Sequence, residues 1–247
     1  MRPTTRVLAA VSRRLHRPEL LAAFNAPARE SQQEEIAIRA VLASALGPDA
    51  IYVDVGTNRG QLLREAVRVA PQGRHVAFEP IPELAEEVRR AFPGVDCRRK
   101  ALGARPETAQ FCHFRRLDGW SGLRRQPEIS DARGAPEFIT VEVSTLEREL
   151  DGVHPAVVKI DVEGAELAVL EGAREVLARA RPMLLFEHQP QAAALYGADS
   201  GTLWDLLAEH GYRIFAVTGA GPLERSRFAT DTIVVNWLAT PAPRPHA

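Results

Sequence analysis

Short apolar runs alternate with longer stretches of helical spacing along most of this chain. The apolar runs, which are typical of buried strands, lie at residues 51–53, 75–78, 95–99, 157–161, 183–186, 212–217 and 231–237. The helical stretches between them lie at residues 61–70, 82–92, 164–180 and 201–210. This alternation predicts an α/β fold built on an open, mostly parallel sheet. In such sheets, ligands bind at the carboxyl ends of the strands, where the strand order reverses.

Two segments flank this pattern. Residues 6–24 and 30–46 have helical spacing, and a Gly-Pro pair ends the second helix. We therefore expect an N-terminal helical appendage or lid at residues 1–48. We place the main domain at residues 49–238 and expect a disordered, proline-rich tail at 239–247.

The segment between the third and fourth predicted strands is less regular. Residues 108–114 and 138–143 each alternate between apolar and polar positions, which predicts the two arms of an edge hairpin. Residues 117–125 form a glycine-containing loop with an embedded tryptophan, and residues 126–136 are rich in turn-forming residues.

A glycine loop connects the first predicted strand to the first helix of the sheet. The strand stops at Asp54, and Gly56 and Gly60 follow before the helix. Glycine lets the backbone approach a ligand closely, and a helix N-terminus offers unpaired N–H groups. An acid at this position repels a pyrophosphate but accepts hydrogen bonds from an ammonium or hydroxyl group. A glycine turn that holds no ligand is the alternative interpretation.

Four acidic residues lie at or just after predicted strand ends: Asp54, Glu79, Asp161 and Glu187. Glu79 comes 19 residues after Gly60, the position at which nucleoside-binding sheets hold the ribose hydroxyls with an acid. NAD and S-adenosylmethionine both carry this ribose. The Asp54 loop favours the second, because its amino-acid tail is cationic and it has no phosphate.

Composition narrows the choice of partners. The 247 residues have a net charge of −1, so no global field favours nucleic acid or an anionic membrane. The only two cysteines, Cys97 and Cys112, suggest reduced thiols, and no apolar run reaches the length of a membrane span. We expect a cytoplasmic protein, and the heavy use of arginine and alanine is typical of bacteria with GC-rich genomes.

Four stretches of the sequence resemble the FkbM-type S-adenosylmethionine-dependent methyltransferases: VDVGTNRG, FEP, KALG and VVKIDVEGAELAVLEGA. The resemblance covers residues 51–233 and implies a seven-stranded Rossmann-like sheet flanked by helices. It also implies methyl transfer to oxygen, often on sugars or sugar-bearing natural products. The candidate cofactor-binding residues are Asp54, Gly56, Thr57, Asn58 and Gly60 beside the methionine part, Glu79 at the ribose, Lys100 and Ala101 near the adenine, and Ser121 and Asp161. The sequence WSGL departs from the Ser-Ser-Leu common in the family, which leaves the role of Ser121 open.

Methyl transfer to an alcohol requires a group that removes the hydroxyl proton. The candidate catalytic residues end two neighbouring strands: Asp161, Glu163, Glu187 and His188. Of these, only His188 has an ordinary pKa near neutrality; the alternative is a structural histidine. Glu163 and Glu166 can instead cap the helix that begins at Gly164, and we favour this role for Glu166. Asp161, Glu187 and His188 could also bind Mg²⁺.

The sequence therefore predicts an S-adenosylmethionine-dependent O-methyltransferase that produces S-adenosylhomocysteine and methylates a hydroxyl of a sugar or oligosaccharide. The alternatives are O-methylation of a polyketide or other small natural product, a catalytically silent cofactor-binding module, and an NAD-dependent oxidoreductase, which would lack its usual glycine fingerprint. A homodimer remains open. Side chains that could bind the acceptor, unless they are core or solvated, are Trp120, Tyr196, Trp204, Arg115, Arg116, Arg124 and Arg125.

Overall fold

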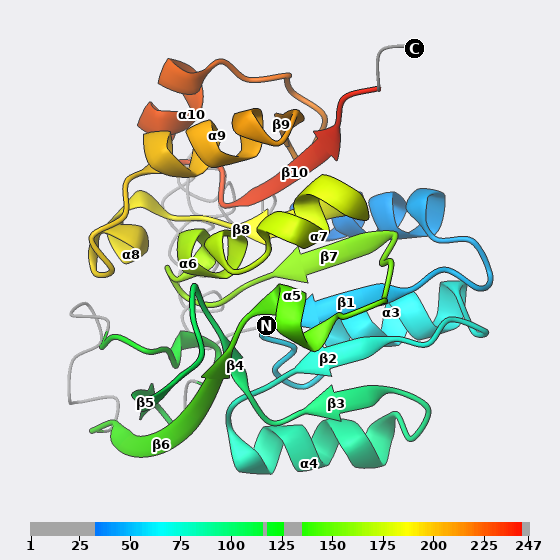
Figure 1. The fold of residues 1–247 in the computed structure, drawn as a ribbon, viewed down its shortest axis with the longest axis vertical. Coiled ribbons are helices and arrows are strands. Elements are labelled where there is room, and N and C mark those ends of the chain that lie inside the picture. Colours follow the sequence, from blue (N-terminus) through cyan, green and yellow to red (C-terminus); the bar gives the residue numbers. More distant parts are fainter. Residues whose placement is uncertain (1–32, 116–117, 126–134, 244–247) are drawn as a thin grey trace, which may run out of the picture.

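A seven-stranded sheet forms the centre of the computed structural model, which describes residues 33–115, 118–125 and 135–243 (Figure 1). Its strand order is β3-β2-β1-β7-β8-β10-β9. The strands are β1 (Tyr52–Val55), β2 (Val76–Phe78), β3 (Asp96–Arg98), β7 (Val157–Ile160), β8 (Met183–Glu187), β9 (Tyr212–Ala216) and β10 (Asn236–Pro241). β10 runs antiparallel to both of its neighbours, β8 and β9, and all the other strand pairs of this sheet are parallel. The predicted Rossmann-like, mostly parallel sheet is therefore confirmed.

The order of the strands reverses between β1 and β7. From β1 the chain builds outward through β2 to β3, and it then crosses back to β7, which pairs with the other side of β1. The carboxyl ends of β1, β2 and β7 consequently meet at one edge. This edge is the position at which open α/β sheets bind ligands.

Two sets of helices bury the two faces of the sheet (Figure 1). One face packs against residues 33–45, which are helical, and against α3 (Gln61–Val69) and α4 (Pro82–Ala91). The other face is covered by α5 (Leu146–Glu149), α6 (Glu166–Glu171), α7 (Arg174–Arg179), α9 (Ser200–Glu209) and α10 (Arg225–Thr230). Successive side chains of a strand point to opposite faces of the sheet. Val53 and Val55 therefore belong to the core beneath the second set of helices, and Tyr52 belongs to the core beneath the first set.

A second, three-stranded sheet lies beside the carboxyl edge of the first sheet (Figure 1). It consists of β4 (Ala101–Leu102), β5 (Glu107–His113) and β6 (Glu137–Ser144) in the order β4-β6-β5. The pairing of β5 with β6 is antiparallel, which confirms the predicted hairpin. The short helices η1 (Asp118–Trp120) and α8 (Pro190–Ala194) lie in loops outside the two sheets.

The helix predicted at residues 164–180 is two helices, α6 and α7, which are separated at Gly172 and Ala173. The carbonyl oxygen of Gly172 accepts a hydrogen bond from the backbone N–H of Glu147 at 3.0 Å. A Cβ on Gly172 would lie 2.1 Å from the carbonyl oxygen of Gly103. The prediction of one continuous helix was wrong because these tertiary contacts hold the chain in a different conformation.

The last strand is also displaced from its predicted position at residues 231–237. The Asp231 carboxylate accepts hydrogen bonds from the backbone N–H groups of Ile233 and Val234, at 2.9 and 3.0 Å, and holds them in a turn. Strand β10 therefore starts at Asn236 and reaches Pro241, beyond residue 238.

Several N-terminal and C-terminal predictions lie outside the described residues. They are the helix at 6–24, the start of the helix at 30–46 and residues 244–247. In the part of the chain that the structure describes, no helix combines the length and the apolar character needed to cross a membrane.

Candidate functional site

A cavity opens at the carboxyl ends of β1, β2 and β7, against the second sheet. Several candidate residues from the sequence line it: Gly56, Asn58, Glu79, Lys100, Ala101, Ser121, Asp161 and Glu163. Sequence reasoning missed Phe78, Leu102, Phe111, Asp118, Gly119 and Leu123, which also line it. Asp118, Gly119 and Leu123 thus contribute a wall that the loop's glycine content alone did not indicate.

The glycine loop after β1 reaches this cavity because it has no side chain at Gly56. A Cβ there would lie 1.9 Å from the carbonyl oxygen of Asp161, and the residue has a φ of 76°. Gly56 therefore lets the loop pass directly over the end of β7. Asn58 follows with a φ of 50°, in the left-handed region, and this conformation aims its N–H group at Glu79.

Glu79 is a buried carboxylate in the cavity wall, 4 % exposed. Its Oε2 accepts from the backbone N–H of Asn58 and its Oε1 from that of Ile81, both at 2.9 Å. Burial raises its pKa to about 7, and these two N–H groups oppose the shift. A carboxylate held at both oxygens keeps further lone pairs with which it can accept hydrogen bonds from a ligand's hydroxyl groups.

Asp54 lies behind the glycine loop rather than in the cavity wall. It is part of β1, which continues to Val55 instead of stopping at Asp54, and its side chain is 1 % exposed. Its Oδ2 accepts from the Thr57 hydroxyl at 2.9 Å, and its Oδ1 lies 3.7 Å from Lys159 Nζ. The structure thus does not bring Asp54 or Thr57 into the cavity. Gly60, with a φ of 71°, packs against Phe92 and is likewise absent from its lining.

Lys159 links this buried layer to the cavity. Its Nζ lies 2.9 Å from Asp161 Oδ2 and donates to the carbonyl oxygen of Gly56 at 3.2 Å. Although burial favours the neutral amine, the charges of Asp161 and Asp54 raise the pKa of Lys159. The lysine is therefore a fixed cation beneath the loop, and it holds the Asp161 carboxylate from behind.

Glu163 occupies the cavity wall with a φ of 57°. Burial, followed by the charges of Asp161, Glu187 and Glu166, raises its pKa to about 9. Its loop is fixed by Glu166, whose Oε1 accepts from the backbone N–H of Gly164 at 3.0 Å and of Val162 at 3.4 Å. Glu166 thus lies in the first turn of α6, which begins at Glu166 instead of Gly164, and it holds the preceding loop without capping the helix. Glu163 lines the cavity.

His188 does not reach the cavity. Its ring is 3 % exposed, stacks on Phe228 at 5.5 Å between centroids, and places Nε2 2.8 Å from the Ser200 hydroxyl. Its Nδ1 lies 3.9 Å from Glu166 Oε2. These contacts correspond to the structural histidine that the sequence left as the alternative.

Glu187 points to the other face of the sheet and lines a small pocket with Lys159 and Asn236. Burial and the charge of Asp161 raise its pKa to about 7. The structure therefore does not bring Asp161, Glu187 and His188 together. Among the described residues, no group of three or more metal-binding side chains is arranged to hold an ion, so the Mg²⁺ site that the sequence left open at these residues has no support here.

We expect His188→Ala to destabilise the fold rather than to abolish chemistry. Removing a buried ring and leaving Glu166 and Ser200 without their neighbour should lower the free energy of unfolding by about 2–4 kcal/mol. Thermal denaturation measures this loss, and His154→Ala, at an exposed position, is the matched control. If His188→Ala keeps the parental melting temperature but loses methyl transfer more than about a hundredfold, His188 is the base after all.

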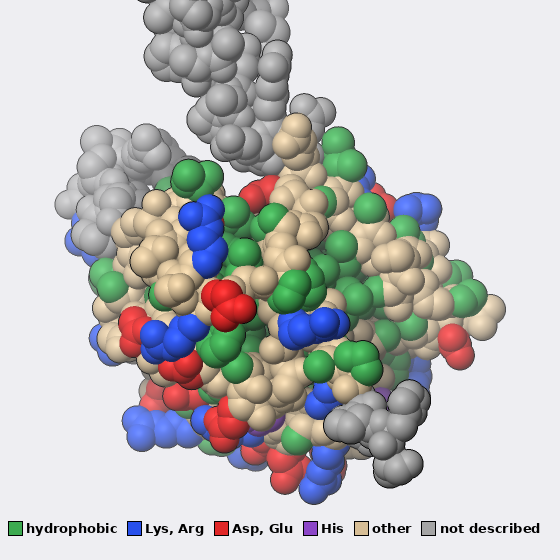
Figure 2. Space-filling model, turned by 90° about the horizontal axis from the view of Figure 1, so that it is seen from above, with side chains coloured by type: hydrophobic (Ala, Val, Ile, Leu, Met, Phe, Trp, Pro, Cys, Tyr) green, Lys and Arg blue, Asp and Glu red, His purple; other side chains and the backbone are tan. Residues whose placement is uncertain are grey.

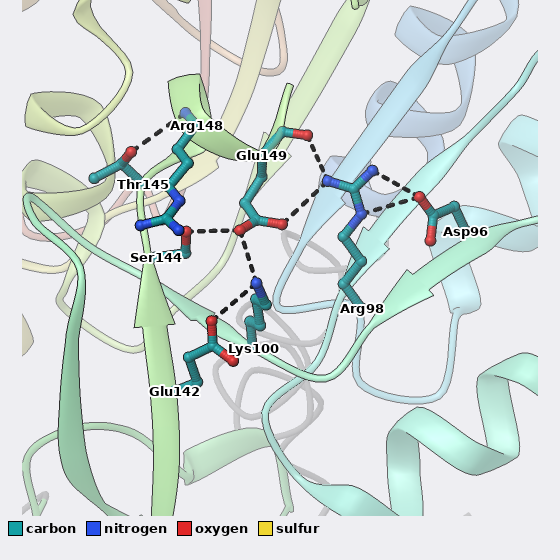
Figure 3. A network of polar contacts seen from close by, with 8 residues as sticks. All are labelled: Asp96, Arg98, Lys100, Glu142, Ser144, Thr145, Arg148 and Glu149. Atoms are coloured by element: carbon teal, nitrogen blue, oxygen red, sulfur yellow. Dashed lines mark hydrogen bonds and ion pairs between the residues drawn. The ribbon is translucent and has the colours of Figure 1, made fainter. Parts of the chain in front are cut away.

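The side of the cavity formed by Lys100 and Ala101 is fixed by a charge network that joins the two sheets (Figure 3). Lys100 Nζ lies 2.9 Å from carboxylate oxygens of both Glu142 and Glu149. Glu149 also contacts Arg98 at 3.1 Å and accepts from the Ser144 hydroxyl at 2.7 Å. Because its ammonium group is paired with two carboxylates, Lys100 contributes chiefly its stem and backbone to a wall that is otherwise apolar.

The loop at residues 118–125 closes the cavity from the side of the second sheet. Asp118 Oδ2 pairs with Arg59 at 2.7 Å, and its Oδ1 lies 3.3 Å from His113 Nε2. The Ser121 hydroxyl accepts from the backbone N–H of Phe114 at 3.0 Å. Asp118 and Gly119 were missed because a loop residue carries no periodic signal, and their only sequence signal was an Asp-Gly pair within that glycine-containing loop.

The candidate acceptor-binding side chains have different surroundings in the structure. Tyr196 lies near the cavity, and its hydroxyl oxygen accepts from the backbone N–H of Arg124 at 3.1 Å. Trp204 instead packs on the core and donates to the carbonyl oxygen of Leu223 at 3.1 Å. Arg115 pairs with Glu137 at 2.8 Å. Trp120 is 45 % exposed, and Arg116 lies outside the described residues.

Acidic and basic side chains intermix over the described part of the face in Figure 2. On that face, lysine and arginine do not gather into one continuous stripe. This distribution fits the net charge of −1.

Comparison with known families gives one match that covers most of the chain. The family described as the methyltransferase FkbM domain matches residues 54–214. This range begins in β1 and ends in β9, so it contains the glycine loop, the second sheet and all the residues that line the cavity.

Individual relatives are distant. The AMB antimetabolite synthetase AmbE of Pseudomonas aeruginosa is 26% identical over 210 residues, covering 68% of this chain and 10% of AmbE. The chain thus spans about a tenth of the length of that curated relative. The crystal structure of a methyltransferase FkbM from Methylobacillus flagellatus is 18% identical with a TM-score of 0.49, covering 79% of this chain and 44% of that one. An O-methyltransferase from Bacillus cereus in complex with S-adenosylhomocysteine is 11% identical with a TM-score of 0.44, covering 97% and 90%.

Proposed function

Because this chain belongs to the FkbM methyltransferase family, we propose that it is an S-adenosylmethionine-dependent O-methyltransferase whose acceptor is a hydroxyl group of a sugar or oligosaccharide. The observation that carries the cofactor assignment is Glu79. Its carboxylate is buried in the cavity wall directly after β2, which neighbours the strand where the order reverses, and two backbone N–H groups hold it there. This is the geometry expected of an acid that binds ribose hydroxyls.

The charge of the cavity suits a cationic methyl donor. Glu79, Asp118, Asp161 and Glu163 all line it, and the ammonium group of Lys100 is already paired with two carboxylates. Asp118 and Asp161 are themselves paired with Arg59 and Lys159, and the raised pKa values of Glu79 and Glu163 favour their neutral forms. The lining nevertheless offers a pyrophosphate no cation besides the paired Lys100, whereas its carboxyl oxygens can accept hydrogen bonds from an ammonium group. The cavity chemistry therefore supports S-adenosylmethionine over NAD.

The individual contacts follow from the shape of the cavity. We assign the loop from Gly56 to Asn58 to the methionine part and Glu79 to the ribose. The adenine ring would lie against Ala101, with Leu102 and Phe111 beside it, because these apolar side chains line the cavity. Asp54 and Lys159 would act by holding the loop in position.

We assign the general base to Glu163, in place of His188. In the reaction the acceptor oxygen bonds to the methyl carbon, the carbon–sulfur bond breaks with its electron pair left on sulfur, and the hydroxyl proton passes to a carboxylate. Glu163 lines the cavity, and its raised pKa of about 9 makes its ionised form a stronger base than an ordinary carboxylate. Asp161 is the weaker candidate, since Lys159 holds its Oδ2 at 2.9 Å.

A small natural product is the second candidate acceptor. The observation that favours it is the relative AmbE, which is called an antimetabolite synthetase and is 26% identical to this chain. That relative is about ten times as long as the matched region, so its substrates are not transferred to this chain.

A panel of acceptors tests the proposed function. The protein is incubated with methyl-labelled S-adenosylmethionine and either oligosaccharides and simple sugars, small phenols, or tRNA. We expect label in the carbohydrate pool alone, and calorimetry to detect binding of S-adenosylhomocysteine but not of NAD. Label in phenols or tRNA and in no carbohydrate would overturn the sugar assignment and leave the cofactor assignment intact.

A further inference from the structure

A second cavity adjoins the cofactor cavity and has no role in the function proposed above. It holds about 630 Å³, a volume within the usual range of about 300–1,000 Å³ for small-molecule sites. It lies between the β5–β6 hairpin and the helix α6, and Tyr196 closes one side. Leu123 and Ala165 line both cavities, so they form the boundary between the two.

Different kinds of charged side chain line the two cavities. The cofactor cavity has four carboxylates in its lining, whereas the second cavity has Arg105, Arg124 and Arg125 with a single acid, Glu107. Glu107 lies 3.4 Å from Arg105 and offsets that charge. Among the described residues, the Arg124 guanidinium group makes no ion pair within 4.0 Å.

Tyr196 fixes the segment that carries Arg124. Its hydroxyl oxygen accepts from the Arg124 backbone N–H at 3.1 Å, and a Cβ on Gly122 would lie 3.2 Å from that oxygen and 3.5 Å from Glu163 Cβ. The tyrosine hydroxyl, Gly122 and Glu163 therefore meet where the second cavity approaches the candidate base. Gly122 itself lines neither cavity, and its lack of a side chain lets Tyr196 and Glu163 pack closely against the backbone there.

We propose that the second cavity is the acceptor site and that the acceptor carries an anionic group, a carboxylate or a phosphate, which Arg124 binds. This inference rests on the proposed function and names its substrate class. An anion is attracted by the arginines of the second cavity, whereas the cofactor cavity offers it carboxyl groups and no cation besides the paired Lys100. The two effects together turn the acceptor so that its anionic end stays in the second cavity and its neutral hydroxyl end faces Glu163.

Binding of three matched sugars to the protein loaded with S-adenosylhomocysteine tests this proposal. Glucose, glucuronate and glucose 6-phosphate share a ring and differ at one carbon, and calorimetry at low salt compares them. We expect one or both anions to bind about ten- to a hundredfold more tightly than glucose, as a charge-assisted contact implies. The glucuronate and glucose 6-phosphate arms tell whether the anion is a carboxylate or a phosphate.

Arg124→Gln should remove this preference, because glutamine keeps the backbone contact with Tyr196 but loses the charge. Arg90→Gln is the matched control, since Arg90 is exposed on α4 and lines neither cavity. Equal binding of all three sugars, no binding of any, or an anion preference that survives Arg124→Gln would each overturn the proposal. The initial titration with S-adenosylhomocysteine distinguishes a failure of the proposed function from a failure of the acceptor proposal. If S-adenosylhomocysteine does not bind, the proposed function itself is contradicted.

Discussion

Glu163→Gln is expected to lower the rate of methyl transfer by about 10²–10⁴-fold, the range for loss of a general base. Glutamine keeps the size and polarity of the side chain but cannot accept the proton. Affinity for S-adenosylhomocysteine should change little, because the fold of the loop depends on Glu166 rather than on Glu163. Initial rates with labelled S-adenosylmethionine, on an acceptor identified by the panel, measure the effect.

The pH dependence of the same reaction gives a second readout. A base acts in its deprotonated form, and the pKa of Glu163 in the free protein is raised to about 9. The parent protein's kcat/KM should therefore rise with pH up to about 9, and the variant should lack this rise. Glu171→Gln, at an exposed position on α6, should behave as the parent. If Glu163→Gln retains the parental rate and profile, the base is Asp161 or a group outside the described residues.

Glu79→Ala is expected to weaken binding of S-adenosylhomocysteine about ten- to a hundredfold, since hydrogen bonds to a charged group are worth about 1.5–3 kcal/mol. Calorimetry measures the affinity, and circular dichroism checks the fold. The parent affinity should rise as pH rises through about 7, because the ionised Glu79 accepts ribose hydroxyls and its pKa lies there. The variant should show no such rise.

Glu83→Ala is the matched control for this experiment, since Glu83 is exposed in the first turn of α4. It should leave both the affinity and its pH dependence unchanged. Unchanged affinity in a folded Glu79→Ala protein would instead remove Glu79 from the cofactor site, and the ribose assignment with it.

The parts of the fold and site that the sequence predicted depend on local patterns. Apolar runs identify the strands, and Gly56 signals the close approach that the structure has at Asp161. Glu79 was found because its distance from the glycine loop is set by one helix and one strand. Each of these features depends on a stretch of about 30 neighbouring residues, so local sequence largely determines it and contacts with distant segments change it little.

The errors arose where the direction of a side chain decides its role. Asp54 and His188 both lie at the correct edge of the sheet, yet one points behind the loop and the other into the core. A strand reverses the direction of its side chains at every residue, so a boundary misplaced by one residue moves a candidate to the opposite face. The second cavity was equally hidden, because it is formed by segments that lie about 90 residues apart.

The charge network around Glu149 has a consequence for engineering this enzyme. All its members in Figure 3 lie at residues 96–100 or 142–149, whereas the arginines and the loop that face the second cavity lie between residues 104 and 141. The junction of the two sheets and the acceptor-facing segment are thus separate stretches of the chain. A chimera that exchanges residues 104–141 with a relative would keep every ion pair of that junction. It would exchange walls of both cavities together, because Phe111, Asp118 and Ser121 of this segment line the cofactor cavity.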